Sequence, residues 1–510
     1  MRPALVLIAL DLCCAISPCR AADVLFADSL AIQPGSLRLG VERLRMPAGE
    51  EPLALAELAA LTDLPWRLYA GPALLGAIAG ERGGFFVAGI EGGWRLESRA
   101  GPGVDVGILA GGGGGGSAAV GGGLMLRGRV ALSWSAGQDR FIAGVARVSF
   151  PSGEIRSTDL YVAWERRFRA VSPRDPLAPW EARGSRGLSF SPASIDLVVA
   201  RRAHPGGLVD TSGRSSLPAL DLVGLAAAFG LGGPWLLRAE GSAAYGGRSG
   251  GYMEVLVGPV VRLPVGASGL AVRGAVAAGS GGGGGVGTGA GLLASGSAGL
   301  ELRFARSFRA GLEGGYLAAP SSSFRASTVG ASLGWTCELA RIAGDAEPPR
   351  EDAKLVAVSW RVRPTLQRYA SGARAAAGGG ATPIEQLAFK ADLLLSDFVY
   401  LTGQSGWAVR GRAGAWATAL LGAGAESPSW FGHRLAVEAL AGAGGGGAIA
   451  TGGGALLQAA AAWSFELTPR IAIQLSAGRT RAVGGRFSSA LLEAGLVFRG
   501  ARLARSSRDG

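Results

Sequence analysis

Three runs of glycine at nearly constant spacing constrain the fold of this chain most strongly. The runs are Gly111–Gly116, Gly281–Gly285 and Gly444–Gly447. Each follows a similar apolar segment, and aromatic residues lie at matching places upstream, at Trp66, Trp235 and Phe398. The interval of about 165 residues is too long for the common solenoid repeats and has the size of a whole domain. The sequence therefore predicts three copies of one domain.

Composition narrows the class of protein further. The chain contains 87 glycines but only 25 prolines among its 510 residues, and no Gly-X-Y period is present, which excludes collagen. The net charge is +12, yet the arginines are scattered singly between apolar residues. Nucleic-acid-binding proteins cluster their basic residues, so we expect no nucleic-acid partner.

The middle copy divides into eight segments of alternating polarity, the pattern of half-buried strands. They are Ser194–Arg202, Ala219–Phe229, Trp235–Tyr245, Tyr252–Leu263, Leu270–Gly279, Leu292–Phe304, Phe308–Leu317 and Phe324–Trp335. Tight connections alternate with longer connections rich in glycine and serine. The fold class predicted is all-β and antiparallel.

Side chains on these segments divide between an apolar and a charged face. Trp235, Leu237 and Tyr245 share one face, whereas Arg238 and Glu240 share the other, because successive residues of a strand point to opposite sides. The expected inward charges of the middle copy nearly balance. They are Asp196, Asp221, Glu240, Glu254, Glu301 and Glu313 against Arg202, Arg238, Arg262, Arg273, Arg303 and Arg309. The inward faces of the first and third copies read as less charged.

These features resemble the transmembrane β-barrels of the Gram-negative outer membrane, with apolar residues outside, short turns at one end and longer loops at the other. Leu491–Phe498, with Gly495 and a final aromatic, resembles the last strand by which such proteins are recognised for insertion. Here a polar tail, 499–510, follows it. The resemblance implies an outer-membrane location and contact with the barrel-insertion machinery, outer-membrane lipid and lipopolysaccharide.

The N-terminus has the parts of an export signal. Residues 1–22 combine a basic start at Arg2, an apolar stretch and small residues before the expected cleavage site. Cys19 follows Pro18 rather than the small residues of a lipoprotein signal, so lipidation is disfavoured but stays open. After cleavage only Cys337 remains, which precludes an intrachain disulfide.

The copies could close in two ways. We expect barrel copies at 36–168, 188–338 and 354–498, separated by linkers at 169–187 and 339–353, which are richer in proline and charge. Three tandem eight-stranded barrels, similar in size to OmpA and OmpX, are preferred because a small barrel must pair its buried charges. One large barrel of about 24 strands is the alternative.

No motif in the chain indicates catalysis, a metal or a cofactor. The glycine runs lack the Gly-Lys-Ser/Thr ending of a phosphate-binding loop, so we interpret them as places of sharp bending or close backbone approach. His204, near Asp210 and Ser212, and His433 have no partner at motif spacing, and we interpret both as loop or turn histidines. We expect no catalytic, cofactor-binding or metal-binding residue.

The expected function is therefore non-catalytic. We predict a scaffold or an accessory to assembly or export of an envelope polymer, with an envelope polysaccharide or protein as partner. A passive, porin-like pore is the first alternative, and an enzyme that modifies lipid A is the second.

Overall fold

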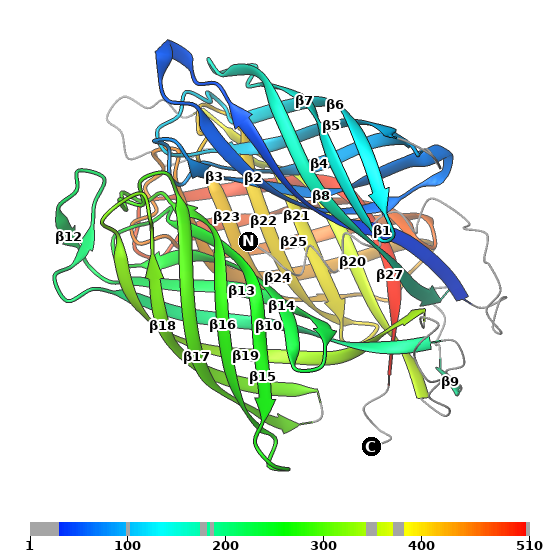
Figure 1. Cartoon of the computed structure of the whole chain (residues 1–510). Coiled ribbons are helices and arrows are strands. Elements are labelled where there is room, and N and C mark those ends of the chain that lie inside the picture. Colours follow the sequence, from blue (N-terminus) through cyan, green and yellow to red (C-terminus); the bar gives the residue numbers. More distant parts are fainter. Residues whose placement is uncertain are drawn as a thin grey trace.

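The computed structural model describes residues 30–97, 102–173, 181–183, 188–305, 307–342, 354–370 and 382–505. Nearly all of them lie in antiparallel strands (Figure 1). The first copy contains β1 Leu30–Leu44, β2 Leu53–Asp63, β3 Leu68–Ala79, β4 Phe86–Leu96, β5 Gly103–Gly114, β6 Leu124–Ala136, β7 Asp139–Ser149 and β8 Arg156–Pro173. Two three-residue 3-10 turns, η1 Pro47–Gly49 and η2 Pro65–Arg67, connect its first three strands.

The other two copies repeat this pattern. The second contains β10 Leu188–Ala203, β13 Leu220–Gly232, β14 Trp235–Gly246, β15 Met253–Pro264, β16 Leu270–Gly282, β17 Leu292–Ala305, β18 Phe308–Ala318 and β19 Arg325–Ile342. The third contains β20 Lys354–Tyr369, β21 Ile384–Leu394, β22 Val399–Arg410, β23 Ala417–Glu426, β24 His433–Gly445, β25 Ala455–Thr468, β26 Ile471–Ala482 and β27 Ser488–Arg505. Three short strands lie outside them: β9 Glu181–Arg183, β11 Leu208–Val209 and β12 Ser215–Leu217.

The first strand of each copy pairs on both sides within its own copy. Arg38 of β1 lies opposite Ala59 of β2 and Glu165 of β8. In the same way β10 pairs with β13 and β19, and β20 pairs with β21 and β27. Each set of eight strands thereby forms a closed ring, which leaves no unpaired edge strand within it.

Further pairs join the rings. Leu339 of β19 pairs with Ala504 of β27, and Arg341 of β19 pairs with Ala170 of β8. The short strand β9 adds to β20, so the hydrogen-bonded sheet as a whole has 25 strands. The predicted all-β antiparallel barrel is confirmed, and the pairing combines closure within each copy with a continuous sheet across all three.

The eight strands predicted for the middle copy are confirmed, and the boundaries shift mainly at the outer ends. The terminal strands run beyond the ends expected for the repeats: β1 begins at Leu30, β8 continues to Pro173, and β19 continues to Ile342. The first residues of both expected linkers therefore belong to strands. β27 likewise continues through the first part of the expected polar tail, as far as Arg505.

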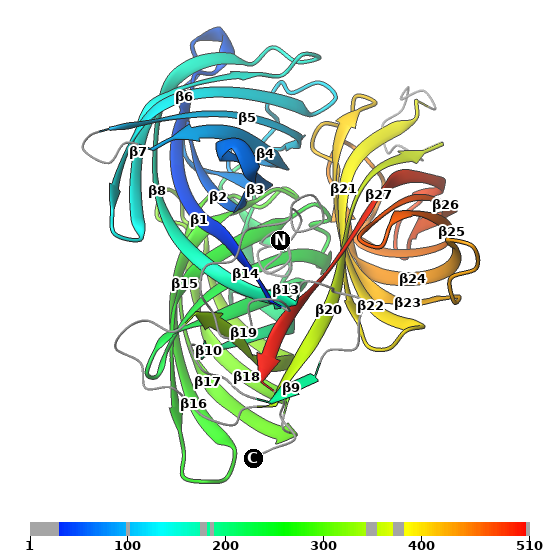
Figure 2. The same ribbon diagram turned by 90° about the vertical axis from the view of Figure 1, so that its right-hand side faces the viewer.

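The strand extensions are ordered by packing between copies. Leu30 and Val171, Leu188 and Ala340, and Leu355 and Leu503 occupy corresponding places at the start of a first strand and the end of a last strand. These six residues form one buried apolar cluster, where the extended strand ends converge (Figure 2). Charged residues such as Arg499 and Arg502 alternate with these apolar ones, which explains why the sequence reads as a polar tail.

The glycine runs lie where the copies meet. Gly83 donates a backbone hydrogen bond to Gly289 O at 2.9 Å, and Gly414 donates one to Gly121 O at 3.2 Å. A Cβ on Gly251 would lie 2.8 Å from Gly446 N. In each case the loop before the fourth strand of one copy contacts the loop after the fifth strand of the next. The three contacts form a closed cycle, the geometry of a head-to-tail ring.

An apolar cluster fills the space where all three copies meet. It comprises Phe86 and Ala88 of β4, Met253 and Val255 of β15, Trp407 of β22 and Ala417 of β23. The outward faces of these strands, which the sequence assigns to lipid, are therefore partly buried against neighbouring copies. The expected close approach of backbones at the glycine runs is confirmed; it occurs within a copy, as at Gly113 beside Phe86, and between copies, as at Gly282 beside Gly84.

Two glycines with nearly the same backbone angle test this contact. Gly84 has φ +82° and its Cβ would overlap the backbone of Gly282 and Gly283, whereas Gly213 has φ +84° and open space around it. We expect Gly84→Ala to lower the free energy of unfolding by about 1–3 kcal/mol more than Gly213→Ala, since only the first overpacks an interface. Denaturant unfolding in detergent micelles measures both, and equal losses would contradict the contact.

Candidate functional site in the barrel interiors and on the outer walls

The two faces of each wall differ as the sequence predicts. In β14, Arg238 and Glu240 are buried inside the ring, whereas Trp235 and Tyr245 are exposed on the outer face. Because eight strands enclose only enough room for side chains, polar groups that point inward must find partners among themselves. The interiors of the rings are therefore the first candidate for a functional site.

The interior of the first ring is a network of ion pairs. Arg127 contacts Glu42 at 3.1 Å and both Glu57 and Glu91 at 2.6 Å. Arg38 contacts Glu165 at 2.7 Å and also pairs with Glu91. The buried basic and acidic side chains are equal in number: Arg38, Arg95, Arg127, Arg129 and Arg140 against Glu42, Glu57, Glu91, Asp105 and Glu165.

This network corrects the expectation that the first copy is weakly charged inside. Three of its five carboxylates, Glu57, Glu91 and Asp105, stand alone among apolar residues and glycine. A single charge in an apolar strand gives little local pattern. Only pairing with neighbouring strands shows that these isolated charges meet.

The second ring holds a similar network. Arg309 contacts Asp196 at 2.7 Å, and Arg202 contacts Glu254 at 2.6 Å. Ten of the twelve expected inward charges take part in such pairs: Asp196, Arg202, Arg238, Glu240, Glu254, Arg262, Arg273, Glu301, Arg309 and Glu313. Asp221 instead pairs with the exposed Arg201 at 3.3 Å, and Arg303 is exposed at a strand end.

The third ring is also charged inside, which corrects the expectation that the inward face of the third copy is weakly charged. It also includes a neutral layer. Arg363 contacts Asp392 at 2.7 Å, and Lys390 contacts Glu493 at 2.7 Å. Beside these pairs, Gln404 and Gln458 donate to each other at 3.4 and 3.0 Å. Four buried glutamines share this layer: Gln367, Gln386, Gln404 and Gln458.

Apolar clusters close each ring at its long-loop end. Their members come from equivalent loops, as shown by Phe85, Tyr252 and Trp416, each of which is fully buried just before the fourth strand. Apolar side chains therefore lie above the paired charges in every ring. This arrangement leaves the interiors filled with side chains along the described strands.

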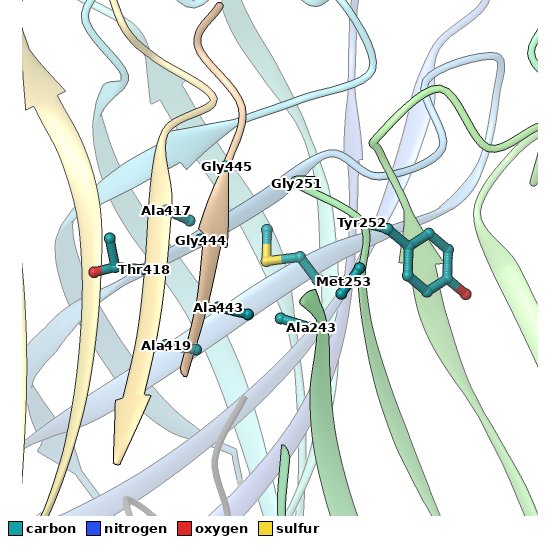
Figure 3. A pocket seen from close by; sticks show the side chains of 11 residues that line it. Ala243, Gly251, Tyr252, Met253, Ala417, Thr418, Ala419, Ala443, Gly444 and Gly445 are labelled. Atoms are coloured by element: carbon teal, nitrogen blue, oxygen red, sulfur yellow. The ribbon is translucent and has the colours of Figure 1, made fainter. Parts of the chain in front are cut away.

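A hollow between the second and third rings does not form a reactive site. It is lined largely by alanine and glycine, where Ala243 and Met253 face Ala417, Ala419 and Ala443 (Figure 3). The side chain of Thr418, also in its wall, is buried inside the third ring. The hollow is a gap in apolar packing between two outer walls.

The outer walls have the properties of a membrane-facing surface. Leu160, Val130 and Ile108 of the first ring are exposed by more than 60%, and Trp66, Trp235 and Phe398 are exposed at equivalent tight turns. An apolar band with interfacial aromatics around a closed barrel is the arrangement that a bilayer requires. The chain is an integral outer-membrane β-barrel protein.

Among the residues that the structure describes, no helix has the length and hydropathy needed to cross a membrane.

The structure brings the candidate Asp210 and Ser212 together, but His204 makes a separate contact. Asp210 Oδ1 accepts hydrogen bonds from Ser212 Oγ at 2.6 Å and Arg214 N at 3.0 Å, which closes the tip of the β11–β12 hairpin. Hydrogen bonds from Ser212 and Ser216 also hold the pKa of Asp210 below its usual range. His204 Nδ1 accepts instead from Gly206 N at 3.3 Å.

His433 has a structural role at a turn of the third ring. Its Nδ1 accepts a hydrogen bond from Trp463 Nε1 at 3.1 Å, and its ring packs against Phe465 at 4.9 Å. Among the described residues, no group of three His, Cys, Asp or Glu side chains is placed to hold a metal ion. The expected export signal, residues 1–22 with Cys19, lies outside the described residues.

Comparison with known proteins gives no family. No protein-family model and no curated protein matches the chain. Among solved structures it is similar to OpdQ of Pseudomonas aeruginosa, at 9% identity and TM-score 0.20, over 93% of this chain and 97% of that one. It is also similar to the siderophore receptor PirA from Acinetobacter baumannii, at 8% identity and TM-score 0.27, over 92% and 80%. TM-scores this low assign neither arrangement nor function.

The buried network of the first ring makes a sharp stability prediction. We expect Arg127→Met to lower the free energy of unfolding by about 3–5 kcal/mol, because it leaves buried carboxylates without their cation. Arg147→Met is the control, since Arg147 is exposed on β7 and surface changes stay within about 0.5 kcal/mol. Thermal or denaturant unfolding in micelles compares them. Similar small losses for both would show that the interior is open to water.

Proposed function

We propose that this chain is a non-catalytic outer-membrane scaffold built from three closed, eight-stranded barrels of the OmpA and OmpX size class. One observation supports this most directly: the interior of each ring is filled by paired charges below an apolar cluster. A protein with filled interiors acts through its surfaces, so its function is to hold partners in the envelope. An envelope polymer or its assembly proteins are the proposed partners.

The cyclic contact between copies supports a scaffold as well. Three separate barrels on flexible linkers would present three independent surfaces, whereas this chain fixes its barrels through glycine contacts and the two shared apolar clusters. The long loops of all three then share one side, which we propose faces outward, and the strand extensions converge on the periplasmic side. We further propose that the barrel-insertion machinery recognises the last strand, including Leu491–Phe498, when the chain enters the outer membrane.

Passive, porin-like transport is the second candidate, and the third ring is where it would occur. Its layer of glutamines is neutral, and Gln386 Oε1 lacks a hydrogen-bond partner within the described residues. Rotation of a glutamine side chain breaks only neutral hydrogen bonds and separates no buried ion pair. Water and small solutes would therefore pass this layer more easily than the charged layers of the other rings.

Conductance in planar bilayers separates the two candidates. We expect the wild-type chain, recovered from outer membranes and showing heat-modifiable migration, to give no stable channel steps. Gln404→Ala with Gln458→Ala removes the pair that closes the neutral layer. The control is Gln33→Ala, buried in the part of β1 that pairs with β8 but extends beyond β2. Large, stable conductance steps in the wild type would contradict the scaffold. A further increase in conductance in the double variant, but not in the control, would place the pore in the third ring.

The enzyme alternative has its own test. We expect His204→Ala combined with His433→Ala to leave the lipid A of the host membrane unchanged in mass spectra, because each histidine accepts a structural hydrogen bond. A modification present with the wild-type chain and absent with this variant, at equal barrel levels in the membrane, would contradict a non-catalytic function.

A further inference from the structure

The charge of the chain is distributed unevenly between its interior and its surface. Buried acidic and basic side chains are equal in number in the first ring and nearly cancel in the second. In the third ring five buried basic side chains exceed three acidic ones, so the buried charges of the described residues account for little of the net charge of +12. Exposed arginines next to the apolar band would meet the headgroups of the membrane.

One position carries such an arginine in every copy. Arg43, Arg201 and Arg368 lie at equivalent places near the long-loop end of the first strand, opposite Ala54, Asp221 and Glu385, and all three are exposed. Arg201 and Arg368 each have one partly exposed carboxylate nearby, at 3.3 and 3.9 Å, whereas at this end of the first ring Asp159 pairs with the neighbouring Arg45 at 3.0 Å. The repeat thus places basic charge at one level on all three outer walls.

Around Arg45 the first ring adds three further arginines. Arg43 of β1, Arg147 of β7 and Arg156 of β8 are all exposed. No ion pair joins them to a carboxylate among the residues that the structure describes. Because Arg147 lies opposite Thr158 and Arg156 opposite Ser149, the two are diagonal neighbours. β1 pairs with β8 on its other side, so four guanidinium groups lie on three adjacent strands, about 10 Å across.

Few acidic groups oppose this cluster. Asp159 contacts Arg45, and Glu154 is exposed in the loop before Arg156. Four arginines against these two carboxylates leave a net positive site. Arginine binds phosphate with paired, directed N–H groups, so the chemistry favours a phosphorylated ligand.

The surface just below the cluster identifies the class of ligand. Val41, Val145 and Leu160 lie on the same three strands, point outward, and are 41%, 47% and 69% exposed. A ligand that contacts both surfaces carries phosphate on an apolar body. We propose that Arg43, Arg45, Arg147 and Arg156 bind the phosphate groups of an anionic lipid in the leaflet at the long-loop end. This inference rests on the proposed membrane orientation.

Lipid binding to the purified full-length chain in neutral micelles tests the site. The probes are bisphosphorylated lipid A, dephosphorylated lipid A, phosphatidylglycerol and heparin, each titrated and followed by native mass spectrometry. We expect tight binding of bisphosphorylated lipid A and weak binding once its phosphates are removed. The combined variant Arg43→Gln, Arg147→Gln and Arg156→Gln should lose roughly fivefold in affinity per arginine.

Two matched variants keep the test specific. Arg67→Gln with Arg166→Gln and Arg303→Gln removes the same charge at the tight-turn end and should leave binding unchanged. Replacing Arg43, Arg147 and Arg156 by lysine should restore part of the affinity, because lysine keeps the charge but not the paired N–H groups. Heat-modifiable migration confirms that each variant is folded.

The outcomes separate this site from the proposed function. Equal binding by the glutamine variant and the wild type, in a chain that inserts normally, would overturn the lipid site alone. Heparin bound as tightly as lipid A would overturn the lipid assignment. A comparable loss for phosphatidylglycerol would support the site and identify phospholipid as a second source of phosphate. Failure of the wild type to enter the outer membrane would instead overturn the proposed function.

Discussion

Closure of eight strands within each copy is the constraint on which the rest of this structure depends. In hydrocarbon, every backbone N–H and C=O must be satisfied within the protein, and pairing β1 with both β2 and β8 does this without an open edge. The narrow ring then determines what its interior can contain. Arg127 cannot reach water, so it is surrounded by Glu42, Glu57 and Glu91.

Closure also explains why glycine is so abundant. Three closed cylinders touch only along curved walls, and their contact is extensive only if backbones approach closely. Gly83 and Gly289, and Gly414 and Gly121, come close enough for main-chain hydrogen bonds between copies. A Cβ at Gly84 or Gly445 would overlap the neighbouring copy. Glycines in and around the runs thus allow close approach both inside each ring and at the interface between rings.

Local alternation was enough to predict the eight strands of the middle copy and the outward direction of Trp235 and Tyr245, because both depend on period two along one strand. Features that depend on neighbouring copies were not predictable in this way. Met253 and Val255 have the pattern of lipid-facing residues, yet they pack against Phe86 and Trp407. Leu503 reads as part of a polar tail because its apolar partners, Val171 and Leu188, lie in other copies.

The junction between the rings shows that the copies have adapted to one another. At three equivalent cross-strand pairs, Gly76 faces Phe86, Ala243 faces Met253, and Trp407 faces Ala417. Each pair combines one small and one large side chain, but the third copy places the large one on the other strand. Three copies with identical sequences would place the same large side chain three times at the centre of the junction. Because these differ, the interior of the junction is specified for one order of rings around the cycle, and covalent linkage in a single chain guarantees that order. The alanine-rich wall of the third copy, which leaves the hollow beside Ala419, follows from the same asymmetry: its bulk is supplied by Trp407 of the neighbouring strand.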